Sequence, residues 1–304
     1  MQSGIDMNDF LQLGFAGLAL GSRYALVALG FVIIYKATGV INFAQGSMVT
    51  LGAYFAYNFH RTWGLPFALA VVMAVVAGGL VGALIQRLLL RRMVGRPVFG
   101  VIMITIGLLF LLTEVMASIW GYDARDLGDP WGIDTVKVGG VVLSVKDLWG
   151  IALAGAVLLA FFVFFKFSGI GLAMRAAAFD QEAALARGIS VRRVFGWSWA
   201  IAGAVAALAG ISLGSGPAAV TPSLGLIALA AFPAMILGGL DSPLGAVIGG
   251  VVIGITQTLT AGYQPEYAAF LGTNFHVVMP YVVMIAILLV RPYGLLGTKE
   301  VHRL

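Results

Sequence analysis

The chain has 304 residues, of which 61% are hydrophobic and only 10% are charged. A soluble domain carries about 25% charged residues, so this composition excludes an ordinary soluble enzyme and indicates an integral membrane protein. The chain has no cysteine, which excludes disulfides, thiol catalysis and thiolate metal sites.

Apolar runs long enough, or nearly long enough, to cross a bilayer recur along the chain, since a crossing requires about 20 apolar residues. In chain order they cover residues 10–34, 42–59, 66–86, 97–120, 148–166, 195–213, 224–239, 244–262 and 276–291. We therefore predict an all-α polytopic membrane protein with about eight to ten transmembrane helices. The first run is interrupted by Gly21-Ser22-Arg23, and the seventh is short and contains Pro233, so both are candidates for broken or re-entrant helices.

Basic residues concentrate on one side of this pattern. One set of connections contains 13 of the 18 basic residues, namely Lys36, Arg87, Arg91, Arg92, Arg96, Lys166, Arg175, Arg187, Arg192, Arg193, Arg291, Lys299 and Arg303. The opposite set contains most of the acidic residues, namely Asp6, Asp9, Asp123, Asp126, Asp129, Asp134, Asp147 and Glu266. The positive-inside rule places the C-terminus in the cytoplasm, and an odd number of crossings then places the N-terminus outside.

Neither long connection is large enough for a separate catalytic domain, so we expect one transmembrane domain over residues 1–304. The outer segment at about 121–147 predicts a β-hairpin at Lys137–Val142, with its turn at Gly139-Gly140. The inner segment covers about 167–194. No G-x-x-x-x-G-K-[ST] phosphate-binding loop is present, so any ATPase activity is expected on another chain.

The inner segment contains a short sequence with strong helix-terminating signals. Asp180 is a suitable N-cap, and Gly188 supplies the left-handed position after the helix, which predicts about two helical turns over 181–187. Glu182 near the start and Arg187 near the end both suit the helix dipole. Ala183, Ala184 and Ala186 permit close approach of a partner, and Leu185 is the expected anchor. Ser190 is expected to cap the next helix.

A Glu-Ala-Ala triplet, three further residues and a glycine on the basic side of the membrane resemble the loop by which importer permeases of the ATP-binding-cassette class hold their ATPase. The resemblance implies that Asp180, Glu182, Ala183, Ala184, Leu185, Arg187 and Gly188 form a coupling helix. The alternative is an ordinary loop helix among positive-inside charges.

Arg23 and Glu114 are the charged residues that fall well inside predicted crossings. An unpaired arginine at the bilayer centre costs roughly 2.5–3.5 kcal/mol on insertion scales, so the two are expected either to pair or to line a pathway. Ser22, Asn42, Gln45 and Gly46 are further pathway candidates, with Gly39 and Gly46 allowing the backbone to bend. The alternative for Asn42, Gln45 and Ser47 is a set of satisfied polar groups at a helix end. Thr256 and Gln257 are expected to hydrogen-bond between helices.

Two stretches carry a resemblance to one family. They are Met174-Arg175-Ala176 through Asp180 to the Glu-Ala-Ala loop, and Leu20-Gly21-Ser22-Arg23-Tyr24-Ala25-Leu26 followed by Gly39-Val40-Ile41-Asn42-Phe43-Ala44-Gln45-Gly46. Together with the order of the apolar runs, they resemble the membrane subunits of branched-chain amino acid importers, the high-affinity leucine/isoleucine/valine permease family. The chain departs from that family at Gln45 and Ser47, where histidine and glutamate are common, and at Arg23, where the residue is usually uncharged.

The resemblance implies a multi-chain importer in the bacterial inner membrane. A second homologous permease subunit, two cytoplasmic ATPase subunits that bind ATP and magnesium, and a periplasmic substrate-binding protein are the implied partners, with no nucleic acid and no cofactor in this chain. The implied substrate is a branched-chain or related amino acid, and urea, short amides and aromatic acids are alternatives within the family. An ATP-independent secondary carrier or channel is the alternative from another class. A membrane enzyme is not supported, because no nucleophile–base arrangement is present.

Overall fold

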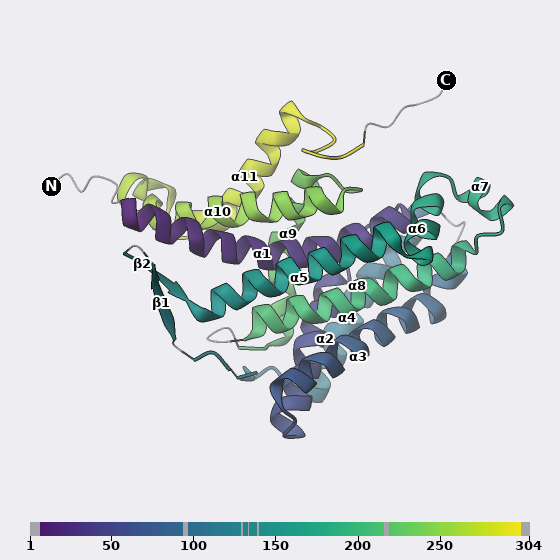
Figure 1. Ribbon diagram of the computed structural model, residues 1–304, viewed down its shortest axis with the longest axis horizontal. Helices are drawn as coiled ribbons and strands as arrows, with labels where there is room; N and C mark the ends of the chain where they lie inside the picture. The colour runs from purple at the N-terminus through teal and green to yellow at the C-terminus, as the bar shows by residue number, and fades with distance from the viewer. Residues whose placement is uncertain are drawn as a thin grey trace. The chain divides into compact units, whose positions relative to one another are not determined.

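The computed structural model describes residues 7–93, 97–128, 130–132, 134–138, 140–215 and 219–298, and this part of the chain is almost entirely helical (Figure 1). The long helices are α1 (Met7–Thr38), α3 (Phe67–Leu88), α4 (Val98–Trp120), α5 (Val145–Phe167), α8 (Val191–Gly214) and α10 (Pro243–Tyr267). Within the described residues, these 6 helices are long and apolar enough to cross a membrane. The all-α polytopic prediction is therefore confirmed.

The remaining elements are shorter. They are α2 (Gln45–Tyr57) with the π-helical turn η1 (Asn58–Thr62), η2 (Leu90–Met93), α6 (Gly169–Phe179), α7 (Gln181–Ala186), η3 (Pro222–Leu226), α9 (Ile227–Gly238), η4 (Ala269–Leu271) and α11 (Phe275–Val290). Every predicted apolar run is helical, but the runs at 42–59, 224–239 and 276–291 form the shorter helices α2, α9 and α11. Helix α6 was not predicted, because its residues were assigned to the inner connection.

The outer connection contains the predicted hairpin. Strands β1 (Thr135–Val138) and β2 (Val141–Ser144) pair in antiparallel register, with Val138 opposite Val141. Gly140 has a φ of +88°, as a tight turn requires, whereas Gly139 lies outside the described residues. Helix α5 begins at Val145, so the outer connection ends slightly before the predicted residue 147.

Contacts between α-carbons divide the chain into two compact units. The first comprises residues 1–28, 131–155 and 230–304, and the second comprises residues 29–130 and 156–229. The expectation of one domain over 1–304 stays a prediction.

The second unit is organised around α2, whose residues are nearly all buried. Its neighbours α3 and α8 lie beside it in Figure 1. The packing is close because small residues face one another: a β-carbon on Gly52 would lie 2.2 Å from the Cα of Ala207, and one on Gly210 would lie 1.9 Å from the carbonyl oxygen of Val49. Such small-residue contacts allow membrane helices to gain van der Waals contact without a hydrophobic driving force.

The first unit contains a glycine-mediated crossing of α1 and α10, which run side by side in Figure 1. A β-carbon on Gly254 would lie 2.2 Å from the backbone nitrogen of Gly21, and one on Gly21 would lie 2.7 Å from the carbonyl oxygen of Gly250. The prediction that Gly21-Ser22-Arg23 interrupts the first run is therefore wrong, since α1 is continuous from Met7 to Thr38. Gly21 admits a neighbouring backbone and leaves its own helix intact. Nearby, Gln257 on α10 accepts a hydrogen bond of 2.9 Å from the Tyr24 hydroxyl. Of the two residues expected to bond between helices, Gln257 does so, whereas the Thr256 hydroxyl donates to Val252 within its own helix.

The close crossing of α1 and α10 leads to a prediction about stability. Gly21→Ala is expected to destabilise the protein by about 1–3 kcal/mol, because the added methyl group has no space against the α10 backbone. Gly14→Ala on the same helix has nothing within 4 Å of the added methyl, so it is expected to be neutral or to stabilise by up to about 1 kcal/mol through helix propensity. Thermal unfolding of the purified variants in one detergent measures both. Equal melting temperatures for the two variants would contradict the crossing.

Candidate functional site

The short helix α7 in the inner connection is held by its own caps. The Asp180 carboxylate accepts hydrogen bonds of 2.9 Å from the backbone N–H groups of Glu182 and Ala183. Gly188 has a φ of +80°, and the N–H of Ile189 donates to the carbonyl of Ala184, which closes the C-terminal end. The helix covers Gln181–Ala186 against a predicted 181–187, with Arg187 at the C-cap. The predicted local structure is therefore confirmed, and the Ser190 hydroxyl caps α8 as expected by accepting from the N–H of Arg193.

The sides of α7 differ in exposure. Ala184 is buried, whereas Leu185 is 57% exposed. Ala183, Ala186, Glu182 and Arg187 are also exposed. Phe179, directly before the N-cap, is 94% exposed and was not singled out from the sequence. Its signal was present, because a large aromatic residue stands beside a polar cap in a connection outside the apolar runs. Leu185 and Phe179 together present apolar surface at this short helix.

The stretch between α1 and α2 has a network of polar contacts. Gly39 adopts a φ of +69°, so the predicted bend at this glycine is confirmed. The Asn42 carboxamide accepts from the N–H of Ala44 at 3.1 Å and donates to the Gln45 side-chain oxygen at 3.3 Å. Both side chains are fully buried. Asn42 therefore satisfies the start of α2, in agreement with the helix-end alternative for this residue, and holds Gln45 in place.

Helix α4 holds the same stretch from the other side. The Thr105 hydroxyl accepts from the backbone N–H of Phe43 at 3.3 Å, and the Ser47 hydroxyl donates to the carbonyl of Leu109 at 3.0 Å. Ser47 and the Thr113 hydroxyl are 3.1 Å apart. These hydrogen bonds hold the start of α2 against α4. They also pair polar groups that would otherwise be buried without a partner, which is costly.

Gly46 does not bend the backbone, and that prediction is wrong. It lies inside α2, where a β-carbon would be 2.4 Å from the carbonyl oxygen of Gly225. A side chain at this position would collide with the backbone of η3. Gly46 therefore lets α2 and η3 come into contact, and the polarity at this place comes from Asn42, Gln45 and Ser47.

A cavity of about 200 Å³ lies beside this stretch within the second unit. Its polar lining comes from the side chains of Thr38, Asn42, Gln86, Thr105 and Gln181, and the rest is apolar, including Met93 and Trp199. Gln86 is 5% exposed, and its amide nitrogen has no hydrogen-bond partner among the described residues. Gln181 is the first residue of α7, so the cavity touches both the capped helix and the Asn42 stretch.

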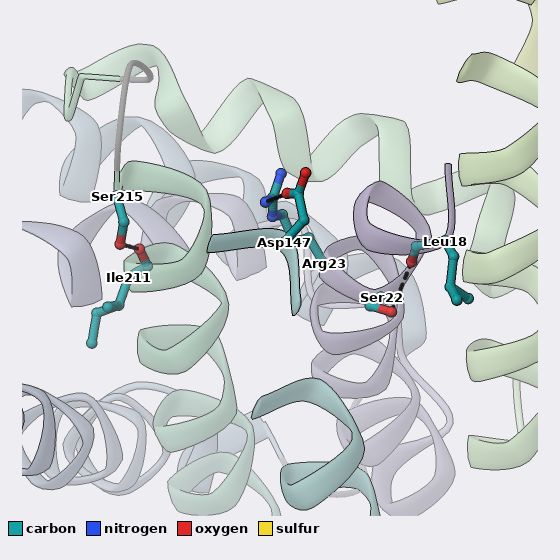
Figure 2. Close-up of polar contacts among 6 residues, drawn as sticks. All are labelled: Leu18, Ser22, Arg23, Asp147, Ile211 and Ser215. Carbon is teal, nitrogen blue, oxygen red and sulfur yellow. Dashed lines mark hydrogen bonds and ion pairs between the residues drawn. The ribbon is translucent and has the colours of Figure 1, made fainter. Parts of the chain in front are cut away.

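Arg23 forms an ion pair, but its partner is not the predicted one. Its guanidinium lies 2.5 Å from the carboxylate of Asp147 in the first turn of α5 (Figure 2). The exposed Glu114 instead accepts a hydrogen bond of 3.0 Å from the hydroxyl of Tyr122, which lies eight residues further along the chain, just after the end of α4. The predicted Arg23–Glu114 pair is therefore wrong. Asp147 was assigned to the outer connection, whereas α5 begins early enough to include it.

Ser22 needs no partner outside its own helix. Its hydroxyl donates to the carbonyl of Leu18 at 2.8 Å, and Figure 2 shows this contact together with the similar one from Ser215 to Ile211. This is the usual way in which a buried serine satisfies itself on a membrane helix.

The sequence comparisons with known proteins all point to one family. The model of the family described as "Branched-chain amino acid transport system / permease component" matches residues 14–288. The chain is 31% identical to the high-affinity branched-chain amino acid transport system permease protein LivH of Escherichia coli, over 97% of each chain. It is 29% identical to the corresponding permease protein BraD of Pseudomonas aeruginosa, over 98% of this chain and 99% of the relative. A probable LivH of Methanocaldococcus jannaschii is 31% identical over 92% and 90%.

One solved structure also resembles the chain. It is that of PsaBC from Streptococcus pneumoniae in complex with Fab, with a TM-score of 0.49 and 15% sequence identity over 95% of each chain. The relatives named above, which cover nearly the full length of this chain, therefore carry the family assignment.

The ion pair between Arg23 and Asp147 leads to a second prediction. Arg23→Leu and Asp147→Leu are each expected to destabilise the protein, because each leaves a partly buried charge without its partner. The double variant is expected to lose less than the sum of the two, with a coupling of about 0.5–3 kcal/mol. Unfolding free energies of the four proteins in the cycle measure the coupling. The matched cycle of Arg23→Leu with Glu114→Leu is expected to be additive, and coupling there but not with Asp147 would contradict the observed pair.

Proposed function

Because the chain belongs to the family of permease components of branched-chain amino acid transport systems, we propose that it is the membrane-spanning subunit of an ATP-driven importer for branched-chain amino acids. The observation that carries the proposal is the family match over nearly the whole chain. The proposed location is the bacterial inner membrane, with the C-terminus and α7 in the cytoplasm, as the distribution of basic residues indicates.

The proposed importer contains four further chains. A second permease subunit completes the pathway, two cytoplasmic ATPase subunits bind ATP with magnesium, and a periplasmic protein delivers the amino acid. This chain performs translocation and no chemical step. The absence of a phosphate-binding loop from its sequence supports the separate location of ATP hydrolysis.

Helix α7 is the proposed contact with an ATPase subunit. An isolated six-residue helix is only marginally stable in water. The caps at Asp180 and Gly188 stabilise α7 before a partner binds. The exposed side chains of Leu185 and Phe179 suit an apolar groove on that partner. The small side chains of Ala183 and Ala186 allow the groove walls to come close.

Movement of α7 is proposed to reach the membrane through two routes. Its first residue, Gln181, lines the 200 Å³ cavity together with Asn42 and Gln86. Its last turn is joined through Ser190 to α8, which packs closely on α2 and α3. When ATP draws the two ATPase subunits together, α7 moves with them, and the stretch that begins at Gly39 shifts relative to its neighbours. The cavity provides the free space that such a shift requires.

The polar groups of the membrane helices favour this mechanism over ion-coupled transport. A secondary carrier needs titratable groups or ion ligands along its pathway. Arg23 is neutralised by Asp147, and Glu114 is exposed beside Tyr122. External energy from ATP is then the simpler source of work.

The ATPase contact yields a third prediction. Leu185→Asp is expected to abolish co-purification of the ATPase subunits and ATP-dependent uptake of leucine, because a charge replaces the apolar anchor. Leu271→Asp, the same exchange at a residue that is 41% exposed in η4, is expected to leave co-purification intact. Affinity purification from the native membrane followed by identification of the retained chains measures both.

A second variant tests the helix by another route. Gly188→Pro is incompatible with a φ of +80° and removes an N–H that bonds to Leu185, so it is expected to give the same loss. Wild-type leucine uptake by the Leu185→Asp and Gly188→Pro variants, with normal membrane insertion, would refute the coupling role of α7. Retained ATPases with uptake of urea or short amides, and not of leucine, would leave the importer class intact and change the substrate.

A further inference from the structure

The groove between α3 and α8 has one apolar and one strongly basic end. It is about 690 Å³ in volume, and the two helices that form it run side by side in Figure 1. Its apolar walls come from Val76, Leu80, Ala83 and Trp197. The basic end is formed by four arginines, Arg87, Arg91, Arg192 and Arg193, and no acidic residue lines the groove.

The four arginines have no counter-charge within the described part of the chain. No ion pair and no side-chain hydrogen bond joins any of them to another described residue, and all four are exposed. Four like charges around one groove repel one another, so an anion in their midst would stabilise the arrangement.

Two of the four arginines lie where the helix dipole disfavours a positive charge. Arg192 and Arg193 lie in the first turn of α8, which contains no acidic residue. Positive charge at a helix N-terminus is unfavourable, because the helix dipole places a partial positive charge there. Arginines anywhere in the cytoplasmic connections would satisfy the positive-inside rule. Their placement around a groove and against the dipole is explained by a bound anion.

The two helices that form the groove approach closely. A β-carbon on Gly79 would lie 3.2 Å from the carbonyl oxygen of Ala200, and Gly79, Gln86 and Gly196 all line the groove. Along α3 the groove is continuous with a row of exposed apolar side chains, namely Leu69, Val72, Val76, Leu80, Leu84 and Leu88. Such a row is the expected lipid-facing side of a membrane helix. From Val76 to Arg87 the apolar length is about 16 Å at 1.5 Å per residue.

We propose that this groove binds an anionic phospholipid, with its phosphate among the four arginines and one acyl chain along the wall formed by Val76, Leu80 and Trp197. Basic pockets between membrane helices at the cytoplasmic side are the known setting for such headgroups. Trp197, 45% exposed, stands between the two ends, where an amphipathic ring suits the membrane interface. An acidic protein surface explains the arginines but leaves the apolar half of the groove without an occupant, whereas a phospholipid matches both halves.

This lipid site does not depend on the proposed import function. It uses none of the residues of α7, and it is expected to be present in the isolated chain as well as in the assembled importer. Its failure would leave the coupling role of α7 unaffected, and the reverse is also true.

Native mass spectrometry of the purified chain tests the proposal. The protein is delipidated and then offered an equal mixture of phosphatidylglycerol and phosphatidylcholine with the same acyl chains. Preferential retention of one phosphatidylglycerol per chain, by about tenfold, is expected from the charge of the headgroup. Arg192→Gln with Arg193→Gln is expected to remove that preference. Arg92→Gln is the control, because Arg92 is an exposed arginine beside the groove residue Arg91 in η2 but does not itself line the groove.

Further measurements separate the lipid from other anions and from unfolding. Glycerophosphate, which has the headgroup charge without acyl chains, is expected to fail to displace the lipid. Thermal unfolding of the arginine variants in detergent is expected to match the control, so that loss of lipid is not loss of fold. Equal retention of the two phospholipids would overturn the proposal. Equal losses in the Arg92→Gln control, or displacement by glycerophosphate, would overturn it too.

Discussion

Close approach of helix backbones, permitted by glycine and alanine, is the constraint on which both compact units depend. Lipid offers apolar side chains no hydrophobic gain from packing together, so membrane helices associate through van der Waals contact at short distance. In the second unit, Gly52 and Gly210 bring α2 and α8 close together in this way. In the first unit Gly21 and Gly254 do the same for α1 and α10. A single added methyl at these positions meets backbone, which has little freedom to move.

Several polar groups in the second unit form hydrogen bonds across this packing, and others lie beside a cavity. Asn42, Thr105 and Ser47 bond across the start of α2, which makes this stretch a polar junction inside an apolar unit. Gln86 has a buried amide nitrogen without a described partner and lines the cavity that Asn42 and the first residue of α7 also line. An unpaired buried donor is costly in a rigid environment. In the proposed transport movement, this donor would be available to a different arrangement of the junction.

The inner connection combines two surfaces of different chemistry. Helix α7 presents Leu185 and Phe179, which suit a protein groove, whereas the start of α8 presents Arg192 and Arg193, which suit an anion. Ser190 joins the two, since it caps α8 two residues after the left-handed Gly188. The proposed ATPase contact and the proposed lipid contact are therefore adjacent in sequence and separable by mutation.

Features set by local chemistry were determined by the sequence alone. Composition defined the membrane class, the apolar runs located the helices, and Asp180, Gly188 and Ser190 predicted the caps of α7 and α8 correctly, because a cap depends on residues within a few positions. The hairpin between β1 and β2 was predictable for the same reason. Which residues meet across the bundle was decided only by the tertiary structure. Gly21 and Gly46 looked like bends, but the backbones of α10 and η3 occupy the space beside them. Arg23 was matched with Glu114 by their shared burial in apolar runs, whereas an earlier start of α5 brings Asp147 to it. Side-chain partners depend on the relative rotation and depth of helices far apart in sequence, and apolar periodicity specifies neither.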